Sequence, residues 1–589
     1  MSKGEKRVDK LEIKRHSLAH ILAAAVLEMF PEAKFGFGPS VKNGFYYDFE
    51  LPRTLIPEDL PIIEEKMKEI IKKNDSFEKK TISIEEASRH FKKLNQNYKL
   101  ELLEDLKKEG HKNATVYKLG SFVDLCSGPH LESTGEINAD SFKLTKISGA
   151  YWKGDENNIM LQRIYGVAFN DKKSLKKYLK EMEEAAKRDH RKIGKEMDLF
   201  VFSDLVGSGL PLFTPKGTMI KEELQKYIES ICRRHGFEKV STPHLANIKL
   251  FEISGHADKF SEELFQVTSK HKQNYAMKPV QCPHQTQIYA SRARSYRDLP
   301  IRYMESEKQY RAEKPGEIGG LNRVIAITVE DGHSFCAIDQ VKQEIKNLVD
   351  NIKEFYGTFG LWGNQKVSLS VRDYQNQDKY IGNEKDWDKC EEMLKEISDE
   401  LGLEAEKQEG EAALYGPKLD FMFKDALGKE VQIPTIQLDF ATPKRFGLTY
   451  IDKKGEKINP VMIHRAILGS YERFMALLIE HYAGKFPVWI APVQATILPV
   501  SEKFNEYAEK IKQQLKEQDI RVELDLSDES LGKKIAGATS QKAPYMLVVG
   551  EKEKESDSVA IRHREGKKQE VMKVDEFLKM IKDEIAKKA

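Results

Sequence analysis

Residues 461–474 read VMIHRAILGSYERF, a pattern that predicts a strand running into a helix. His464 in this stretch is a possible metal ligand, and Arg473 is a possible partner for a nucleotide. An arginine stays charged at any working pH, and its planar face can stack on a purine or brace a phosphate. Gly469 lies between the two and would let a ligand approach the backbone closely. A single histidine beside apolar residues is more often a core residue, so the rest of the chain must decide.

The composition is that of a multidomain protein without a strong net charge. The chain has 589 residues, of which 32% are charged, and its formal net charge is +2. At about 100–200 residues per domain we expect three or four domains, and only local basic patches could meet a polyanion. The five cysteines are scattered and odd in number. This pattern argues against a disulfide framework and favours a reducing compartment, the cytoplasm. No run reaches the roughly 20 apolar residues of a membrane span.

The patterns of strands and helices divide the chain into four parts. Residues 1–170 mix helical patterns with short strands punctuated by glycine, which predicts an α+β domain. Residues 171–195 are rich in lysine and glutamate and predict one linker helix. Residues 196–487 hold aromatic and β-branched runs, which predict a large antiparallel sheet with packed helices. Residues 488–589 alternate strands with helices, as a compact α/β module does.

Three segments of the large domain carry side chains that could bind a metal. They are Cys282 in MKPVQCPH, His333 in VEDGHSFC, and His464. One thiolate and two imidazoles make a three-ligand zinc set, which leaves a fourth position open for water or substrate. Any long chain contains cysteines and histidines at arbitrary separations, so spacing alone leaves the zinc site undecided.

The surrounding motifs resemble a known family. The segment ELQKYIESICRRHGFEKVSTP that ends at Pro243, YRAEKPGE with Arg311, and ILGSYERF with Arg473 resemble motifs 1, 2 and 3 of class II aminoacyl-tRNA synthetases. The metal segments, LYGPKLDF and IQLDF narrow the resemblance to the threonyl-tRNA synthetase family, from about Val8 to the C-terminus. It implies a multidomain α+β and α/β fold with an N-terminal editing domain, a class II antiparallel-sheet catalytic domain and a C-terminal anticodon-binding domain.

The resemblance also implies an activity and its site. We expect ATP-dependent ligation of L-threonine to tRNA(Thr) through a threonyl-adenylate, in a homodimer, with Mg²⁺ and one Zn²⁺ per subunit. Carboxylate attack on a phosphate builds negative charge, which preorganised arginines and Mg²⁺ stabilise. The zinc would test for the threonine hydroxyl, which valine lacks. The implied sets are Arg311, Lys418 and Arg473 for catalysis; Arg311, Glu313, Arg323, Gln432, Thr435 and Arg473 for ATP; Asp331, Tyr415 and Gln437 for threonine; and Cys282, His333 and His464 for zinc.

The chain departs from the family pattern at several positions. Where motif 2 usually continues RVRxFTQDDAHIF, this chain reads RVIAITVEDGHSF, so Ile325, Ile327 and Val329 replace arginine, phenylalanine and glutamine. Isoleucine offers an adenine apolar contact but no π face, so we expect altered affinity. The segment 282–285 reads CPHQ in place of CPGH. Two alternatives therefore stay open: a synthetase-like RNA-binding or regulatory protein with impaired activation, and an editing-only deacylase.

A second group of histidines and a cysteine lies near the start of the chain. His16 and His20 are four residues apart and would share one helix face, although a surface helix with two histidines is the commoner case. Cys126 and His130 form a CxxxH motif that follows Asp124. With GAYWKGDENNIMLQRIYG, these residues resemble the editing domain shared by threonyl- and alanyl-tRNA synthetases, which implies hydrolysis of mischarged seryl-tRNA(Thr). An active site that accepts threonine rejects serine only by about 1–3 kcal/mol, so a second site is needed, and we expect it to work without a metal.

The C-terminal segment LGKKIAGATSQKAPYMLVVGEKE resembles the anticodon-binding domain of class IIa synthetases. Lys533, Lys534 and Lys542 could contact phosphates while splayed bases lie on the sheet. Many members of the family carry an additional small N-terminal domain before the editing domain. Here the editing motif begins at His16, which leaves no room for that domain, and we expect it to be lacking.

Overall fold

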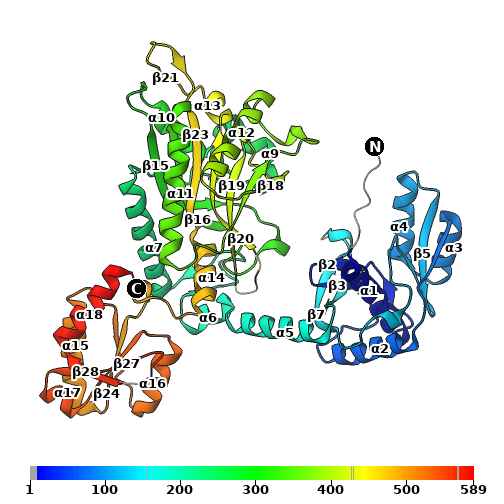
Figure 1. Ribbon diagram of the computed structural model, residues 1–589, viewed down its shortest axis with the longest axis horizontal. Helices are drawn as coiled ribbons and strands as arrows, with labels where there is room; N and C mark the ends of the chain where they lie inside the picture. Colours follow the sequence, from blue (N-terminus) through cyan, green and yellow to red (C-terminus); the bar gives the residue numbers. More distant parts are fainter. Residues whose placement is uncertain (1–8, 156, 426–427, 429, 567–568, 589) are drawn as a thin grey trace. The chain divides into compact units, whose positions relative to one another are not determined.

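The computed structural model describes residues 9–155, 157–425, 428, 430–566 and 569–588. The chain divides into two compact units, residues 1–183 and 184–589, whose elements are drawn in Figure 1. Within the described part of the chain, no helix combines the length and the apolar character that a membrane crossing requires.

The first unit is built around a buried helix. Helix α1 begins after Asp9, whose carboxylate accepts the Leu11 N–H at 3.2 Å, and nearly every residue from Ser17 to Val26 is buried. A helix that is apolar on all faces belongs inside a core, and α1 packs against α2 and the strand β3. The helices are α1 (Lys10–Met29), α2 (Asp59–Lys73), α3 (Ile84–Lys93), α4 (Asn97–Lys108) and α5 (Lys172–Lys187), within which the boundary between the two units falls.

Two antiparallel sheets complete this unit. The larger has the strand order β1-β3-β8-β7, with β2 beside β3, and the smaller has the order β4-β5-β6. Strand β6 ends at Leu125, so Asp124 and Cys126 lie where the chain leaves the sheet. The strands are β1 (Lys34–Phe35), β2 (Ser40–Val41), β3 (Gly44–Glu50), β4 (Glu78–Ser83), β5 (Asn113–Leu119), β6 (Phe122–Leu125), β7 (Phe142–Tyr151) and β8 (Met160–Ala168).

The second unit contains a sheet of eight strands, in the order β11-β15-β16-β23-β20-β19-β17-β18. The inner strand pairs are antiparallel. The edge strands β11 and β18 run parallel to their neighbours, β15 and β17 respectively. The predicted antiparallel sheet is therefore confirmed. The strands are β11 (Glu238–Lys239), β15 (Ile301–Tyr310), β16 (Ala326–Cys336), β17 (Lys366–Val371), β18 (Glu406–Glu409), β19 (Lys418–Lys424), β20 (Glu430–Asp439) and β23 (Val461–Ser470).

Helices cover this sheet and bury its largest apolar cluster. Helices α7 and α11 pack against each other, and α14 follows β23 directly (Figure 1). The helices are α7 (Pro215–Arg234), α8 (Ile248–Ser254), α9 (His256–Lys259), α10 (Cys282–Ala290), α11 (Val341–Thr358), α12 (Glu384–Glu400), α13 (Ala441–Arg445) and α14 (Tyr471–Tyr482). The smaller strands are β9 (Phe200–Val201), β10 (Leu212–Phe213), β12 (Leu245–Asn247), β13 (Gln266–Thr268), β14 (Asn274–Met277), β21 (Tyr450–Ile451) and β22 (Lys457–Ile458).

The expected single linker helix over residues 171–195 is wrong, because the segment forms two helices. Helix α5 ends at Lys187, and α6 (His190–Glu196) begins after Asp189. The Asp189 carboxylate accepts the Arg191 N–H at 2.8 Å, and the Asp189 backbone is non-helical, at φ −50° and ψ 121°. An N-cap residue takes a non-helical conformation, so this cap interrupts the helix.

The C-terminal part of the second unit is an α/β module, as predicted. Its sheet has the order β25-β24-β26-β27-β28, parallel across β25, β24 and β26 and antiparallel beyond. The strands are β24 (Ala495–Pro499), β25 (Val522–Leu524), β26 (Tyr545–Val549), β27 (Ser558–His563) and β28 (Gln569–Lys573), and the helices are α15 (Asn505–Lys516), α16 (Leu531–Ser540), α17 (Glu551–Glu555) and α18 (Val574–Lys587).

One close backbone contact gives a test of this fold. A Cβ atom at Gly416 would lie 1.8 Å from the carbonyl oxygen of Leu438 in β20, a backbone atom that cannot rotate away. We expect Gly416→Ala to destabilise the unit by about 1–3 kcal/mol and to lower its melting temperature in calorimetry. The control is Gly357→Ala in α11, where nothing lies within 4 Å and alanine favours the helix. Equal melting of both variants would contradict the expectation.

Candidate functional sites

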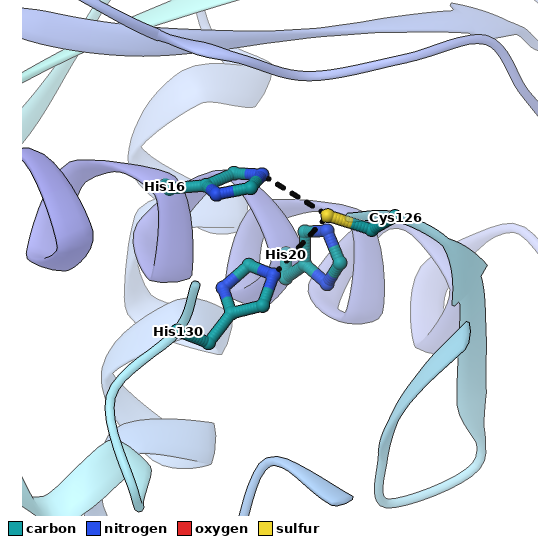
Figure 2. Close-up of side chains that lie close together, drawn as sticks. All are labelled: His16, His20, Cys126 and His130. Carbon is teal, nitrogen blue, oxygen red and sulfur yellow. Dashed lines mark hydrogen bonds between the residues drawn. The ribbon is translucent and has the colours of Figure 1, made fainter. Parts of the chain in front are cut away.

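Four of the predicted editing residues meet in the first unit. His16 and His20 come from α1, and Cys126 and His130 come from the segment after β6 (Figure 2). The Cys126 Sγ lies 3.3 Å from His16 Nε2 and 3.4 Å from His130 Nε2. One ligand atom of each of the four lies within 4.8 Å of the others. The structure thus joins the HxxxH and CxxxH motifs into one cluster.

A buried carboxylate lies behind this cluster. The Asp124 Oδ2 lies 3.3 Å from His20 Nε2 and accepts a hydrogen bond from the Tyr47 hydroxyl at 2.7 Å. Its Oδ1 pairs with the Lys99 ammonium, which also donates to the Tyr47 hydroxyl at 3.1 Å. Lys99 is only 1% exposed, and sequence reasoning missed it, because a lysine in a polar helical pattern is usually solvated.

The electrostatics of the cluster favour neutral groups. Burial raises the pKa of the Cys126 thiol to about 11 and lowers the pKa of His130, and also that of His20, below the ordinary histidine value. A thiol with such a pKa is protonated near neutral pH and is a poor nucleophile. Imidazoles with lowered pKa values are weak bases but still donate and accept hydrogen bonds. His16, His20 and Cys126 line a cavity of about 430 Å³, which His130 does not line, so the cluster can position a water beside a bound ester.

The predicted metal ligands of the second unit also meet. Cys282 begins α10, His333 lies in β16, and His464 lies in β23. The two histidines are direct partners in the antiparallel register. All three are buried, and their ligand atoms lie within 4.8 Å of one another.

In each of the two histidines, one ring nitrogen has a hydrogen-bond partner and the other is left for a metal. The Gln285 Oε1 lies 2.7 Å from His333 Nδ1, and the Asp439 Oδ2 lies 2.8 Å from His464 Nε2. Since an amide oxygen only accepts, His333 Nδ1 carries the proton, and Nε2 is left for a metal. By the same argument His464 offers Nδ1. Such outer partners are typical of histidine metal sites, so these residues fit a zinc ion.

The segment CPHQ is explained in part by this geometry. Gln285, its last residue, is fully buried and supplies the partner of His333. His284 beside it is 7% exposed, and neither of its ring nitrogens has a hydrogen-bond partner. Burial, followed by the charge of Lys278, lowers the pKa of His284 to about 4, which keeps this ring neutral.

A cavity of about 230 Å³ lies beside the metal ligands and is rich in arginine. The Arg473 guanidinium donates to the carbonyl oxygens of Asn322 at 3.1 Å and Gln432 at 3.2 Å. Burial, followed by the charges of Arg311 and Arg323, lowers the pKa of Arg473. A bound anion would offset both effects. The predicted residues that line the cavity are Cys282, Arg311, Glu313, Arg323, Asp331, Tyr415, Thr435, Gln437, His464 and Arg473.

Three of the predicted substrate residues are arranged for polar recognition. The Tyr415 hydroxyl donates to Gln437 Oε1 at 2.6 Å, and its ring stacks on His464 with 4.1 Å between centroids. Burial raises the pKa of Asp331 to about 7, because its charge is poorly solvated. A hydroxyl, an amine or a metal ion beside Asp331 would stabilise its carboxylate.

Three predicted residues do not line this cavity, namely His333, Lys418 and Gln432. The Lys418 ammonium pairs with Asp420 Oδ2 at 2.8 Å, and the Gln432 side chain donates to Asp420 Oδ1 at 2.5 Å. Thr435 donates to the same oxygen at 2.9 Å, so Asp420, which sequence reasoning missed, gathers all three. Gln432 instead lines a neighbouring cavity of about 540 Å³ together with Arg323 and Arg473.

The three motif 2 residues that depart from the family pattern fall into two groups, according to whether they line the cavity. Ile327 and Val329 line the cavity and give it apolar surface. Ile325 does not line it, and its backbone N–H donates to the Gly209 carbonyl at 2.9 Å.

Three stretches of the chain match known protein families. Residues 265–482 match the tRNA synthetase class II core domain (G, H, P, S and T), and residues 494–584 match the Anticodon binding domain. Residues 114–165 match the Threonyl and Alanyl tRNA synthetase second additional domain. The fold, the arginine-lined cavity and these matches define a class II aminoacyl-tRNA synthetase.

Full-length relatives narrow this class. A Threonine–tRNA ligase of Gloeobacter violaceus is 45% identical, with 98% of this chain and 93% of that protein covered. A Threonine–tRNA ligase of Phocaeicola vulgatus is 46% identical, with 97% and 88% covered. A crystal structure of the RNA binding domain of threonyl-tRNA synthetase from Cryptosporidium parvum matches at 34% identity and a TM-score of 0.64, with 67% of this chain and 98% of that chain covered. The chain belongs to the threonine–tRNA ligase family, as the sequence motifs predicted.

Proposed function

We propose that this chain ligates L-threonine to tRNA(Thr) with ATP, through a threonyl-adenylate, and removes serine from mischarged tRNA(Thr) in its first unit. One observation carries the proposal: buried Cys282, His333 and His464 lie beside a cavity lined by Arg311 and Arg473. The cysteine and the two histidines suit recognition of an amino acid, and the two arginines suit binding of a polyphosphate. The relatives named Threonine–tRNA ligase support the same activity.

In the activation step, the threonine carboxylate attacks the α-phosphorus of ATP and pyrophosphate leaves. Negative charge that develops on the phosphoryl oxygens would be stabilised by Arg311 and Arg473, with Mg²⁺ sharing the load. Glu313 and Arg323, which form an ion pair at 2.6 Å, would hold the nucleotide from the motif 2 side. Lys418, Gln432 and Thr435 would complete the ATP site from the Asp420 side.

Recognition of threonine would rest on Cys282, His333 and His464, which would hold one zinc ion per chain. Zinc held there would supply a Lewis acid to which the amine and the hydroxyl could bind beside the three protein ligands. Asp331 would accept a hydrogen bond from the hydroxyl, with Tyr415 and Gln437 beside the amine. Valine would leave the half-buried Asp331 without a donor, and unpaired polar groups in a site give strong discrimination.

Amino-acid-dependent ATP–pyrophosphate exchange tests the synthetic activity. We expect kcat/KM to be highest for threonine, about 10–200-fold lower for serine, and about 10⁴-fold lower for valine. The reason is that serine keeps the hydroxyl, whereas valine replaces it with a methyl group. Arg473→Ala should abolish exchange with all three, because it removes a phosphate partner.

Absence of exchange from a zinc-loaded wild-type protein would contradict the proposal. It would favour a synthetase-like regulatory protein, or a deacylase that uses the first unit alone. Equal rates with threonine and valine would contradict the role of Asp331.

Metal analysis tests the zinc assignment separately from activity. We expect about one zinc per chain in the wild type, none in Cys282→Ala, and an unchanged content in the matched variant Cys126→Ala. Gln285→Leu should hold zinc about 10–100-fold less tightly against a chelator, because His333 loses its outer partner. Zinc that is lost from Cys126→Ala but kept in Cys282→Ala would place the metal in the first unit and overturn the assignment.

The editing reaction would be hydrolysis of the ester between serine and the tRNA 3′ end. A water held by His16, His20, Cys126 and His130 would attack the ester carbonyl, and the bond to the ribose oxygen would break. Because burial keeps the Cys126 thiol protonated, we assign it to positioning rather than to nucleophilic attack. Asp124 would orient His20 through their 3.3 Å contact.

Deacylation of seryl-tRNA(Thr) tests this site. We expect His20→Ala and Cys126→Ala to slow hydrolysis by about a hundredfold, since each removes a group that positions the water. The control is His111→Ala, an exposed histidine in the same unit and outside the cavity. Threonine-dependent exchange should not change in any of the three variants. Wild-type deacylation rates in both cluster variants would show that the site is not used.

Further parts of the proposal concern partners. We propose that the module at residues 488–589 binds the anticodon arm of tRNA(Thr), and that α7, which carries motif 1, contributes to a homodimer interface. All five cysteines are free, and we propose the cytoplasm as the compartment.

A further inference from the structure

His190, the first residue of α6, is buried and lies outside every motif used above. Its Nδ1 lies 2.7 Å from the Glu480 Oε1 in α14, and its Nε2 accepts the Leu321 backbone N–H at 3.1 Å. Since a backbone N–H can only donate, Nε2 carries no proton, and Nδ1–H donates to Glu480. The ring therefore bridges two segments that are more than a hundred residues away from it in the sequence.

The contact with Leu321 fixes a tight turn of the motif 2 loop. Within this turn Gly319 N–H donates to the Arg323 carbonyl at 3.2 Å, and Asn322 N–H donates to the Gly319 carbonyl at 3.1 Å. Gly320 has a φ of +53°, and a Cβ atom there would lie 2.4 Å from His190 Nε2. Only a glycine at this position lets the turn reach the ring.

The same turn holds the arginines of the nucleotide cavity. The Asn322 carbonyl accepts from Arg473 Nε at 3.1 Å, and Arg323 pairs with Glu313 at 2.6 Å. Glu480 lies in α14, the helix that also carries Arg473. His190 thus connects the loop and the helix whose arginines face one another in the cavity.

Asp189, His190 and Glu480 are close enough to be considered as metal ligands. Both ring nitrogens of His190 are already engaged, however, with Glu480 and with the Leu321 N–H. A metal ion would have to break one of these contacts and leave a buried backbone N–H without a partner. The geometry therefore favours a structural link over a metal site.

We propose that His190 is a positioning residue for ATP, which acts by holding the turn at residues 319–323 so that the Asn322 carbonyl keeps Arg473 aimed into the cavity and Arg323 stays paired with Glu313. The proposal rests on the proposed function, because it takes this cavity as the ATP site. It predicts that the loss of the contact with Leu321 weakens ATP binding and leaves threonine binding intact, since the hydrogen bonds of Asp331, Tyr415 and Gln437 go to partners outside the turn.

Two substitutions of similar size separate the two contacts of the ring. An asparagine amide can replace Nδ1–H and donate to Glu480, but it is too short to reach the Leu321 N–H. A glutamine can place its amide oxygen near the position of Nε2 and accept from Leu321. We expect His190→Asn to raise the KM for ATP in exchange roughly tenfold, the effect of one lost hydrogen bond, with kcat and the KM for threonine within about twofold. His190→Gln should stay within about threefold of the wild type.

A second pair of variants tests the contact between His190 and the turn without changing the His190 side chain. Gly320→Ala should raise the KM for ATP in the same way, because its Cβ pushes the turn off His190. Gly316→Ala in the same loop, where nothing lies within 4 Å, should leave it unchanged. Calorimetric titration with ATP, on proteins that melt as the wild type does, gives the same comparison without turnover.

The outcomes are distinguishable. Equal effects of His190→Asn and His190→Gln, or a parallel rise of the KM values for ATP and threonine, would overturn the positioning role. If the wild type lacks exchange, the proposed function fails, and the calorimetric comparison still decides the role of His190. An ATP-specific loss in His190→Asn and Gly320→Ala, absent from His190→Gln and Gly316→Ala, would establish it.

Discussion

The catalytic sheet depends on one buried carboxylate, that of Glu330. Glu330 lies in β16, and the pairing of β16 with β23 is irregular. Glu330 lies opposite Gly469, whereas Gly332 lies opposite Arg465, so β23 advances by four residues while β16 advances by two. The bulge removes Ile467 and Leu468 from the ladder, and the Glu330 Oε2 accepts their N–H groups at 2.9 and 3.2 Å. Because buried N–H groups without partners are costly, this carboxylate is what makes the bulge tolerable.

The bulge separates two kinds of chemistry along one strand. His464 lies before it, in register with His333 of β16 and Gln437 of β20. Arg473 lies after it, just inside α14. An insertion of even length keeps the alternation of faces, so recognition of the amino acid and binding of the nucleotide can share one side of the sheet. The separation of His464 and Arg473 along the sequence therefore reflects the separation of the amino-acid part and the nucleotide part of the proposed active site.

The proposed editing site and the proposed catalytic site each bury charged groups, but they stabilise these charges in different ways. In the first unit a lysine and a tyrosine surround Asp124, so the charge behind the cluster is balanced. In the cavity beside the metal ligands Asp331 has a raised pKa and Arg473 a lowered one, so the charged form of each is disfavoured until a ligand of opposite charge binds. This contrast fits a site that positions a neutral water and a site that binds charged substrates.

Most of the residues that the structure gathers into the two clusters and the arginine-lined cavity were predicted from sequence, because motifs such as HxxxH, CxxxH and YERF carry their side chains at short spacing. Their supporting partners could not. Lys99, Asp420 and His190 lie in helical or strand patterns where a polar residue is usually exposed, and each is bound to a group distant in sequence. The two-helix linker was missed for a related reason, since the cap at Asp189 depends on one local hydrogen bond rather than on composition.

By itself, the sequence determined the family, the order of the domains, and which side chains are candidates for metal-binding and phosphate-binding chemistry, because these depend on residue identity and short spacing. Only the tertiary structure decided which nitrogen of each histidine is left for a metal, that Gln285 supports His333, and that His190 reaches the motif 2 loop. These features depend on hydrogen bonds between strands and helices that folding brings together, and a buried donor or acceptor takes whichever partner the fold places beside it.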